Sequence, residues 1–306
     1  MKTYINRKPV QGPWGGGNMW IKSAYEILPR LGHVIVDIKD LPEVLYLVGL
    51  SGDEGFISVD EAISYKKWAS SVGKKVYLIL RVNENDARKG TKDIDEKIRR
   101  FSKEVDKIVF VSKWLQDYFS LEGVDYKEDV IHNGVDKSIF KSNGKINNGK
   151  INIVTHHWSD NYLKGFDVYD AIDQWISNNT DFTFTYIGRE RGSFSNTKVI
   201  KPMFGKELGD ELGKYDVYVS ASRFDPGPNH IIESLSCEIP TYVHYQGGGC
   251  IEFSGEDHIY KDEKSLLNIL SKKVYTKNEH WMPPSWEECM IKFSTIAKEF
   301  INEKRS

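Results

Sequence analysis

The sequence predicts an α/β fold built as two successive parallel-sheet domains. Short apolar segments, rich in β-branched and aromatic residues, alternate with helical patterns along most of the chain. In residues 215–249 a strand, a helix and a second strand follow one another, and such a crossover joins parallel strands. A polar stretch rich in glycine and asparagine, residues 142–150, separates the two series and is the best candidate for a linker.

The composition of the 306 residues, 40% hydrophobic and 28% charged, is typical of a globular protein. A formal net charge of −2 gives no reason to expect nucleic acid as a partner. No run approaches the about 20 apolar residues of a membrane span, and the first strand begins without a signal-peptide pattern. We therefore expect a cytoplasmic protein. The composition leaves open its oligomeric state and a peripheral contact with a membrane.

The first strand pattern, residues 1–5, leads into a glycine-rich stretch that contains Gly16 and Gly17, and a helical pattern follows. A glycine-rich loop between a strand and a helix can hold phosphate through its backbone N–H groups. The glycine spacing departs from the dinucleotide-binding motif, and no ribose-binding acid follows a second strand, which argues against a nicotinamide site. A plain surface loop is the alternative interpretation.

A polar loop follows the predicted central strand at residues 75–80. It contains Arg81, Asn83 and Asp86, and open α/β sheets bind ligands at the carboxyl ends of their strands. Position alone makes these three residues candidates for ligand contact, and a solvated turn is the alternative. Further along, a strand pattern at residues 107–111 precedes Ser112, a candidate N-cap residue.

Two acids stand eight residues apart in the second half of the chain, Asp225 in a loop after a strand and Glu233 on the following helix. Asn229 is a candidate N-cap of that helix, and a helix start with free backbone N–H groups favours phosphate. A ligand bound there would touch both acids at the carboxyl end of the sheet. The alternative is an ordinary strand–helix–strand unit with surface acids.

This unit resembles the donor site of retaining glycosyltransferases with the GT-B fold, in particular glycosyltransferase family 4. In that family the pattern is usually a glutamate, seven residues and a second glutamate, followed by a Gly-Gly-x-x-Glu stretch. Here Asp225 stands at the first position and Glu233 at the second. The resemblance covers nearly the whole chain, loosely before Lys107 and well from Val130 to Glu252. Its other motifs stand in the family's order: Gly16-Gly17, Asn133-Gly134-Val135-Asp136, Lys164-Gly165 and Gly248-Gly249-Cys250-Ile251-Glu252.

The resemblance implies a GT-B fold, an α/β fold of two Rossmann-like domains facing each other across a cleft. Residues 1–141 would form the acceptor-side domain, residues 151–283 the nucleotide-sugar donor domain, and residues 284–306 a C-terminal helix that packs back on the first domain. The implied activity is a metal-independent sugar transfer, with retained anomeric configuration, from a nucleotide-diphosphate sugar to a glycan, lipid or small molecule. No cofactor is implied, and UDP or GDP is the expected nucleotide.

Individual residues also receive roles from the resemblance. Lys164 would stabilise the leaving diphosphate, Glu233 would bind the ribose and Asp225 would position the donor sugar. Asp225 and Lys164 are therefore the predicted catalytic residues. Further donor contacts are expected at Gly16, Gly17, Arg189, Asn229, His230 and Ile231. Arg81, Asn83 and Asp86 are acceptor-side candidates by position alone.

Two positions depart from the family pattern. Trp158 stands where the family has an arginine for the diphosphate, so we expect Arg189 or Arg191 to supply the missing charge. Pro228 stands where the family often has a glycine, and proline has no backbone N–H. These departures keep a non-catalytic nucleotide-sugar-binding protein as the alternative function. Zinc at the adjacent pair His156-His157 is not expected, because neighbouring side chains in a loop rarely both reach one ion.

Overall fold

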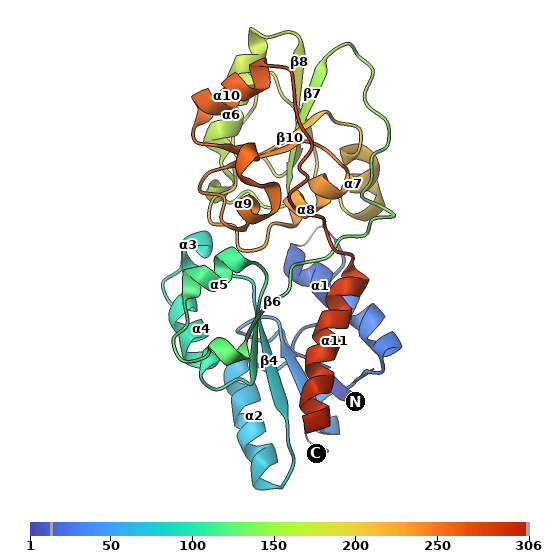
Figure 1. Cartoon of the computed structure of the whole chain (residues 1–306), viewed down its shortest axis with the longest axis vertical. Helices are drawn as coiled ribbons and strands as arrows, with labels where there is room; N and C mark the ends of the chain where they lie inside the picture. The colour runs from blue at the N-terminus through green and yellow to red at the C-terminus, as the bar shows by residue number, and fades with distance from the viewer. Residues whose placement is uncertain (13–14, 304–306) are drawn as a thin grey trace. The chain divides into compact units, whose positions relative to one another are not determined.

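The computed structural model describes residues 1–12 and 15–303. The chain forms two compact units: Met1–Gly134 together with Pro284–Ser306, and Val135–Pro283. Within the described residues, each unit contains a six-stranded sheet whose neighbouring strands are all parallel, with helices on both faces (Figure 1). The predicted α/β fold with two Rossmann-like domains is therefore confirmed.

The first sheet has the strand order β2-β1-β3-β4-β5-β6. Successive residues alternate between its two apolar cores: in β3, Leu45 and Leu47 join one core, and Val44 and Tyr46 join the other. Burial on both faces explains the continuous apolar runs of the central strands. The strands are β1 Lys2–Ile5, β2 Val34–Ile35, β3 Val44–Leu47, β4 Tyr77–Val82, β5 Lys107–Phe110 and β6 Glu128–Val130.

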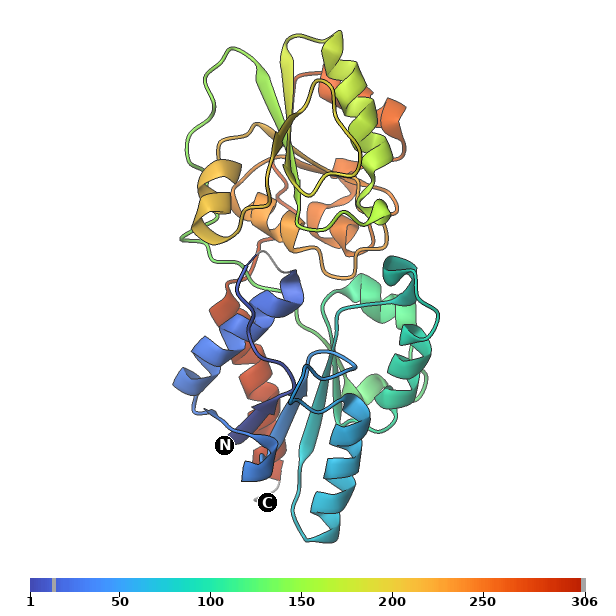
Figure 2. The same ribbon diagram turned by 180° about the vertical axis from the view of Figure 1, so that it is seen from behind.

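Helices α2, α4 and α5 cover one face of the first sheet, and α1 and α11 cover the other, where they lie side by side (Figure 2). The hydroxyl of Ser112 accepts a hydrogen bond from the Leu115 N–H at 3.1 Å, which confirms the predicted N-cap. The helices are α1 Gly16–Ile27, α2 Val59–Ser71, α3 Asp86–Lys89, α4 Ile94–Ser102, α5 Lys113–Phe119 and α11 Trp286–Glu303, with 3₁₀ helices η1 Leu28–Leu31, η2 Ile38–Asp40 and η3 Asp125–Lys127.

The C-terminal helix α11 is part of the first unit. Phe293 is fully buried, and its backbone carbonyl accepts a hydrogen bond from the Tyr46 hydroxyl at 2.9 Å. Near its start, α11 meets the chain at Gly134, where a Cβ would come within 2.5 Å of the Trp286 backbone. The glycine of the Asn-Gly-Val-Asp motif is therefore required for close packing, and not for the tight turn that a glycine there suggests.

The second sheet has the order β12-β11-β10-β7-β8-β9. Helices α6 and α10 pack on one face, and α7, α8 and α9 pack on the other. The strands are β7 Ile151–His157, β8 Phe182–Gly188, β9 Lys198–Ile200, β10 Val217–Ser220, β11 Thr241–His244 and β12 Ile259–Tyr260. The helices are α6 Phe166–Ser177, α7 Gly205–Leu212, α8 Asn229–Ser236, α9 Gly249–Ser254 and α10 Glu263–Ser271, with 3₁₀ helices η4 Tyr162–Lys164 and η5 Glu256–His258.

The division between the units lies at Gly134, before the polar stretch 142–150 that composition suggests as the linker. That stretch is tied to the second unit by backbone hydrogen bonds. The Asn143 N–H donates to the Gly213 carbonyl at 3.1 Å, and the Ile146 N–H donates to the Lys214 carbonyl at 3.0 Å. The polar composition of residues 142–150 therefore indicates a surface segment of the second unit, and not the boundary between the units.

Among the helices in residues 1–12 and 15–303, none has the length and apolar composition that a membrane-spanning segment needs.

Candidate functional site

The carboxyl edge of the second sheet gathers the three most specific predicted residues. Lys164 ends η4, which follows β7; Asp225 lies in the loop after β10; and Glu233 lies on α8. Because β7 and β10 are parallel neighbours, these connections emerge at the same edge of the sheet. The structure thus places residues that are up to 69 positions apart in the sequence, Lys164 and Glu233, at one edge.

Lys164 and Asp225 form an ion pair, with 3.2 Å between Nζ and Oδ2. Both side chains are nearly buried, at 11% and 9% exposure, so little water screens this pair. The backbone of Asp225 is fixed by Gly248, which forms a parallel bridge with it. Gly248 has a φ of 68°, and a Cβ there would approach the Asp225 carbonyl oxygen to 2.8 Å. The glycine cluster therefore serves to position Asp225.

Glu233 pairs with a residue that sequence reasoning did not place in the site, His156. The distance from His156 Nε2 to Glu233 Oε2 is 2.8 Å, and the side chains are 8% and 17% exposed. The sequence contained one signal for this role, the position of His156 at the carboxyl end of β7. The adjacent His157 turns to the other face of the strand, where its Nε2 lies 2.6 Å from the Tyr169 hydroxyl. Within the described residues, no group of three His, Cys, Asp or Glu side chains could hold a metal ion.

Helix α8 begins at Asn229, with Pro228 at the N-cap position, so the prediction of Asn229 as the N-cap is wrong by one residue. Pro228 has an extended backbone, whereas Asn229 already has the helical conformation. At the N-cap position, Pro228 has no side-chain group that could accept a hydrogen bond from this helix, and the positive end of a helix dipole favours an anion. The side chains of His230 and Ile231 are buried, and His230 Nε2 lies 2.8 Å from Ser220 Oγ. Burial keeps both side chains from a donor contact, and the Ile231 N–H already donates to the Pro228 carbonyl at 3.0 Å.

Two arginines on the loop after β8 each lie over an aromatic ring of the loop after β7. The Arg189 guanidinium carbon is 5.8 Å from the Trp158 ring centroid, and that of Arg191 is 5.8 Å from the Tyr162 centroid. Such contacts are attractive because the ring face is electronegative. Trp158, which stands where the resembled family has an arginine, therefore has the guanidinium of Arg189 over its ring. Trp158 itself lies on the loop that leads to Lys164.

The predicted residues of the first unit lie in two different settings. Gly16 and Gly17 form the first turn of α1 and not a preceding loop, and among the described residues no side chain caps that helix start. The Asn83 amide nitrogen lies against Gly17, 3.2 Å from the position that a Cβ would take. The structure thus brings together a glycine predicted for the donor and an asparagine predicted for the acceptor.

Arg81 and Asp86 are committed to the structure of the first unit. Arg81 is 3% exposed, donates to Asn133 Oδ1 at 2.7 Å and lies over the Trp20 ring at 5.6 Å. Burial lowers the pKa of its guanidinium to about 10, and two of its nitrogens, Nε and Nη1, have no partner among the described residues. The Asp86 carboxylate accepts from the backbone N–H groups of Ile94 and Asp95, each at 3.1 Å, at the start of α4. A solvated turn is therefore the wrong interpretation for Arg81.

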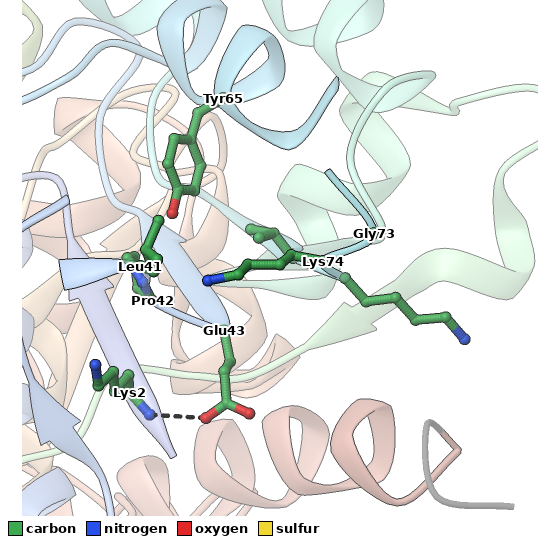
Figure 3. A pocket seen from close by; sticks show the side chains of 9 residues that line it. Lys2, Leu41, Pro42, Glu43, Tyr65, Gly73 and Lys74 are labelled. Atoms are coloured by element: carbon green, nitrogen blue, oxygen red, sulfur yellow. Dashed lines mark hydrogen bonds between the residues drawn. The ribbon is translucent and has the colours of Figure 1, made fainter. Parts of the chain in front are cut away.

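A pocket of about 420 Å³ lies elsewhere in the first unit (Figure 3). Lys2, Glu43 and Val76 stand at or just before the amino ends of β1, β3 and β4, and they line the pocket with Lys74 and Tyr65. The Lys2 N–H donates to Glu43 Oε2 at 3.0 Å. This is the edge of the sheet opposite to Arg81 and Asn83, and the pocket contains none of the predicted site residues. We place no substrate there.

No protein-family model and no curated protein matches the sequence. The structure is similar to sucrose-phosphate synthase from Thermosynechococcus elongatus, with a TM-score of 0.70, 10% identity and 99% of both chains covered. It is also similar to Anabaena HepE in complex with UDP and glucose, with a TM-score of 0.61, 12% identity and 89% of both chains covered.

A third similar structure is the pneumococcal O-GlcNAc transferase GtfA in complex with UDP and GlcNAc, with a TM-score of 0.61 and 12% identity. That match covers 92% of this chain and 60% of GtfA. Identities this low establish the fold alone. The chain has the GT-B fold that the sequence predicted.

Proposed function

We propose that this chain is a retaining glycosyltransferase of the family 4 type, which moves a sugar from a nucleotide-diphosphate sugar to an acceptor hydroxyl without a metal ion. The observation that carries the proposal is the pairing of Lys164 with Asp225 and of Glu233 with His156 at one edge of a sheet in a GT-B fold. The HepE and GtfA structures contain UDP, which makes UDP the first nucleotide to test.

In the proposed complex the donor diphosphate lies at Lys164 and at the start of α8. A lysine and a helix N-terminus both favour negative charge at this place. A diphosphate carries more charge than one lysine balances, and Arg189 and Arg191 stand on the neighbouring loop. Trp158 supports this arrangement by holding Arg189 through its ring face.

The proposed reaction breaks the bond between the anomeric carbon of the sugar and an oxygen of the diphosphate. The acceptor oxygen forms a bond to the same carbon on the same face, and its proton passes to a phosphate oxygen of the leaving group. Lys164 stabilises the negative charge that develops on the diphosphate. Asp225 binds hydroxyls of the donor sugar and so fixes the anomeric carbon, and no residue of the chain forms a covalent intermediate.

Glu233 takes the nucleotide part of the donor in this proposal, through the hydroxyls of the ribose. In the first unit, Gly16, Gly17 and Asn83 are kept as substrate contacts, whereas Arg81 and Asp86 are assigned to the fold. All three cysteines are buried and form no disulfide, which fits a reducing compartment, and we place the reaction in the cytoplasm.

The test is a thermal-shift screen with UDP, GDP, dTDP and ADP, followed by their sugars. A ligand at 100 times its dissociation constant adds about 2.7 kcal/mol of stability. With the best donor, NMR of the released sugar or product gives the anomeric configuration. An inverted product contradicts the retaining mechanism. Turnover that chelators abolish and added metal ions restore contradicts metal independence.

Turnover also separates the enzyme from the alternative, a non-catalytic nucleotide-sugar-binding protein. An enzyme of this kind hydrolyses its donor slowly even without an acceptor, because water can take the acceptor's place. A protein that binds a nucleotide sugar tightly and never cleaves it would be a binding protein, with Trp158 marking a site that lacks its arginine. Stabilisation by NAD and by no other nucleotide would exclude both.

A further inference from the structure

Strand β7 ends in two histidines with different partners, and the first of them contacts the acid that the proposed function assigns to the ribose. His156 Nε2 lies 2.8 Å from Glu233 Oε2, and both side chains are largely buried. We propose that His156 is a positioning residue for nucleotide recognition, which holds the Glu233 carboxylate in the orientation that receives the ribose hydroxyls. The inference rests on the proposed function, because that function gives Glu233 its ligand.

The ring of His156 is itself held in place. It packs edge-on against Tyr218 and His230, with centroid distances of 5.5 and 6.2 Å. The His156 backbone N–H donates to the Tyr218 hydroxyl at 3.2 Å. A carboxylate can only accept hydrogen bonds, so Nε2 is the donor to Glu233. The other ring nitrogen, Nδ1, is buried and has no partner among the described residues, so no second contact turns the ring away.

This contact commits one carboxylate oxygen of Glu233 and leaves the other, Oε1, for a ligand. A glutamate side chain has several rotatable bonds, and ordering it costs conformational entropy. Because His156 orders the carboxylate in the folded protein, that entropy is not lost again when the nucleotide binds. The ribose should therefore bind more tightly than it would to a free glutamate, and the gain should depend on the Nε2 donor of His156.

Three variants of His156 separate the donor from the volume of the ring. His156→Phe keeps a ring and removes the donor. His156→Asn places an amide near the position of Nδ1, and this shorter side chain does not reach Glu233. His156→Gln places an amide near the position of Nε2, from which it can donate to Glu233. His258→Phe is the matched control, since His258 is 5% exposed, bonds to the Thr276 carbonyl and stands at the amino end of β12.

The measurement is calorimetric titration with UDP and GDP, and then, for the tighter of the two, with its 2′,3′-dideoxy counterpart. In the wild-type protein, loss of the hydroxyls should weaken binding about 10- to 100-fold, the worth of a hydrogen bond to a charged group. In His156→Phe and His156→Asn this ratio should fall by about an order of magnitude. His156→Gln should keep most of the ratio, and His258→Phe should keep all of it.

The ratio distinguishes positioning from general damage, because a loosened fold weakens both nucleotides alike. A full dideoxy penalty in His156→Phe or His156→Asn overturns the role of His156 and leaves the proposed function standing. Equal affinity of the wild-type protein for both nucleotides also overturns it. Failure of the wild-type protein to bind any nucleoside diphosphate overturns the proposed function together with the inference. If His156→Phe does not fold, His156→Asn and His156→Gln still decide the question.

Discussion

The two sheets carry polar residues at their carboxyl edges, and the two edges use them differently. At the second edge, Lys164, Asp225 and Glu233 pair with other side chains of the same edge, and Glu233 keeps part of its surface exposed. At the first edge, Arg81 bonds to the crossover residue Asn133, and Asp86 caps α4. Polar residues at such an edge therefore do not by themselves identify a binding site. The partner of each residue decides whether a ligand can replace or extend its contacts.

The largest expected effect lies at the second edge. Lys164→Ala should lower kcat about 100- to 1000-fold, because the lysine faces charge that grows as the glycosidic bond breaks. Nucleotide affinity should fall as well, since the diphosphate carries charge before the reaction. Initial rates with the best donor, beside titration with the bare nucleotide, measure both effects. Unchanged turnover in a folded Lys164→Ala protein would remove this edge from the catalytic site.

Arg81→Ala tests the first edge. The substitution removes the bond to Asn133 and the contact with the Trp20 ring, and it leaves a cavity, so unfolding should require about 2–4 kcal/mol less free energy. Nucleotide affinity should not change. Urea denaturation and nucleotide titration measure these two quantities. If Arg81→Ala had normal stability but its rate no longer saturated with acceptor, Arg81 would be a substrate contact. The difference between the two sheet edges would then disappear.

Within the second edge, the two acids should differ. Glu233→Ala should weaken binding of the bare nucleotide by about 1.5–3 kcal/mol, the worth of a hydrogen bond to a charged group. Asp225→Asn should bind the bare nucleotide at least as well as the wild-type protein, because Lys164 no longer faces a negative charge. It should nevertheless turn over the sugar donor slowly. Equal loss of nucleotide affinity in both variants would contradict this division of roles.

The smallest expected effect concerns His33, a buried histidine of the first unit that contrasts with His156. Its Nδ1 lies 2.8 Å from Thr3 Oγ1 and its Nε2 lies 2.9 Å from Ser294 Oγ on α11. Burial, with the N-terminus and Lys298, lowers the pKa of His33 to about 4. The unfolded chain, with a pKa near 6.5, then binds the proton more tightly, so stability falls as the pH drops below 6.5.

When the pH falls from 7 to 5, this histidine should lower the free energy of unfolding of the first unit by about 2 kcal/mol. Urea denaturation at the two pH values gives the loss, and His33→Gln gives the background from all other groups. The difference between the two proteins is the contribution of His33. If His33→Gln loses as much stability as the wild-type protein, the imidazole is not the source of the pH dependence.

The sequence by itself determined the fold class, the order of the motifs and the central pair of acids. These features depend on local patterns: alternating strand and helix signals, a glycine cluster, and Asp225 and Glu233 at a fixed spacing. The sequence also marked Trp158 as a departure and directed attention to Arg189. The prediction of the fold class succeeds because strand and helix periodicity and turn residues act over a few positions.

Tertiary structure alone decided which polar residues are available to a ligand. His156 and Glu233 are 77 residues apart, and that separation gives no sign that they are in contact. The packing of β7 against β10 and α8 brings His156 Nε2 to 2.8 Å from Glu233 Oε2. Arg81 lies near the carboxyl end of β4, within the strand and not in the loop after it, and the packing of α1 and the crossover segment buries it. Packing against Trp286 likewise explains the glycine at position 134. Burial and partner choice depend on segments distant in the chain, and local sequence patterns do not encode them.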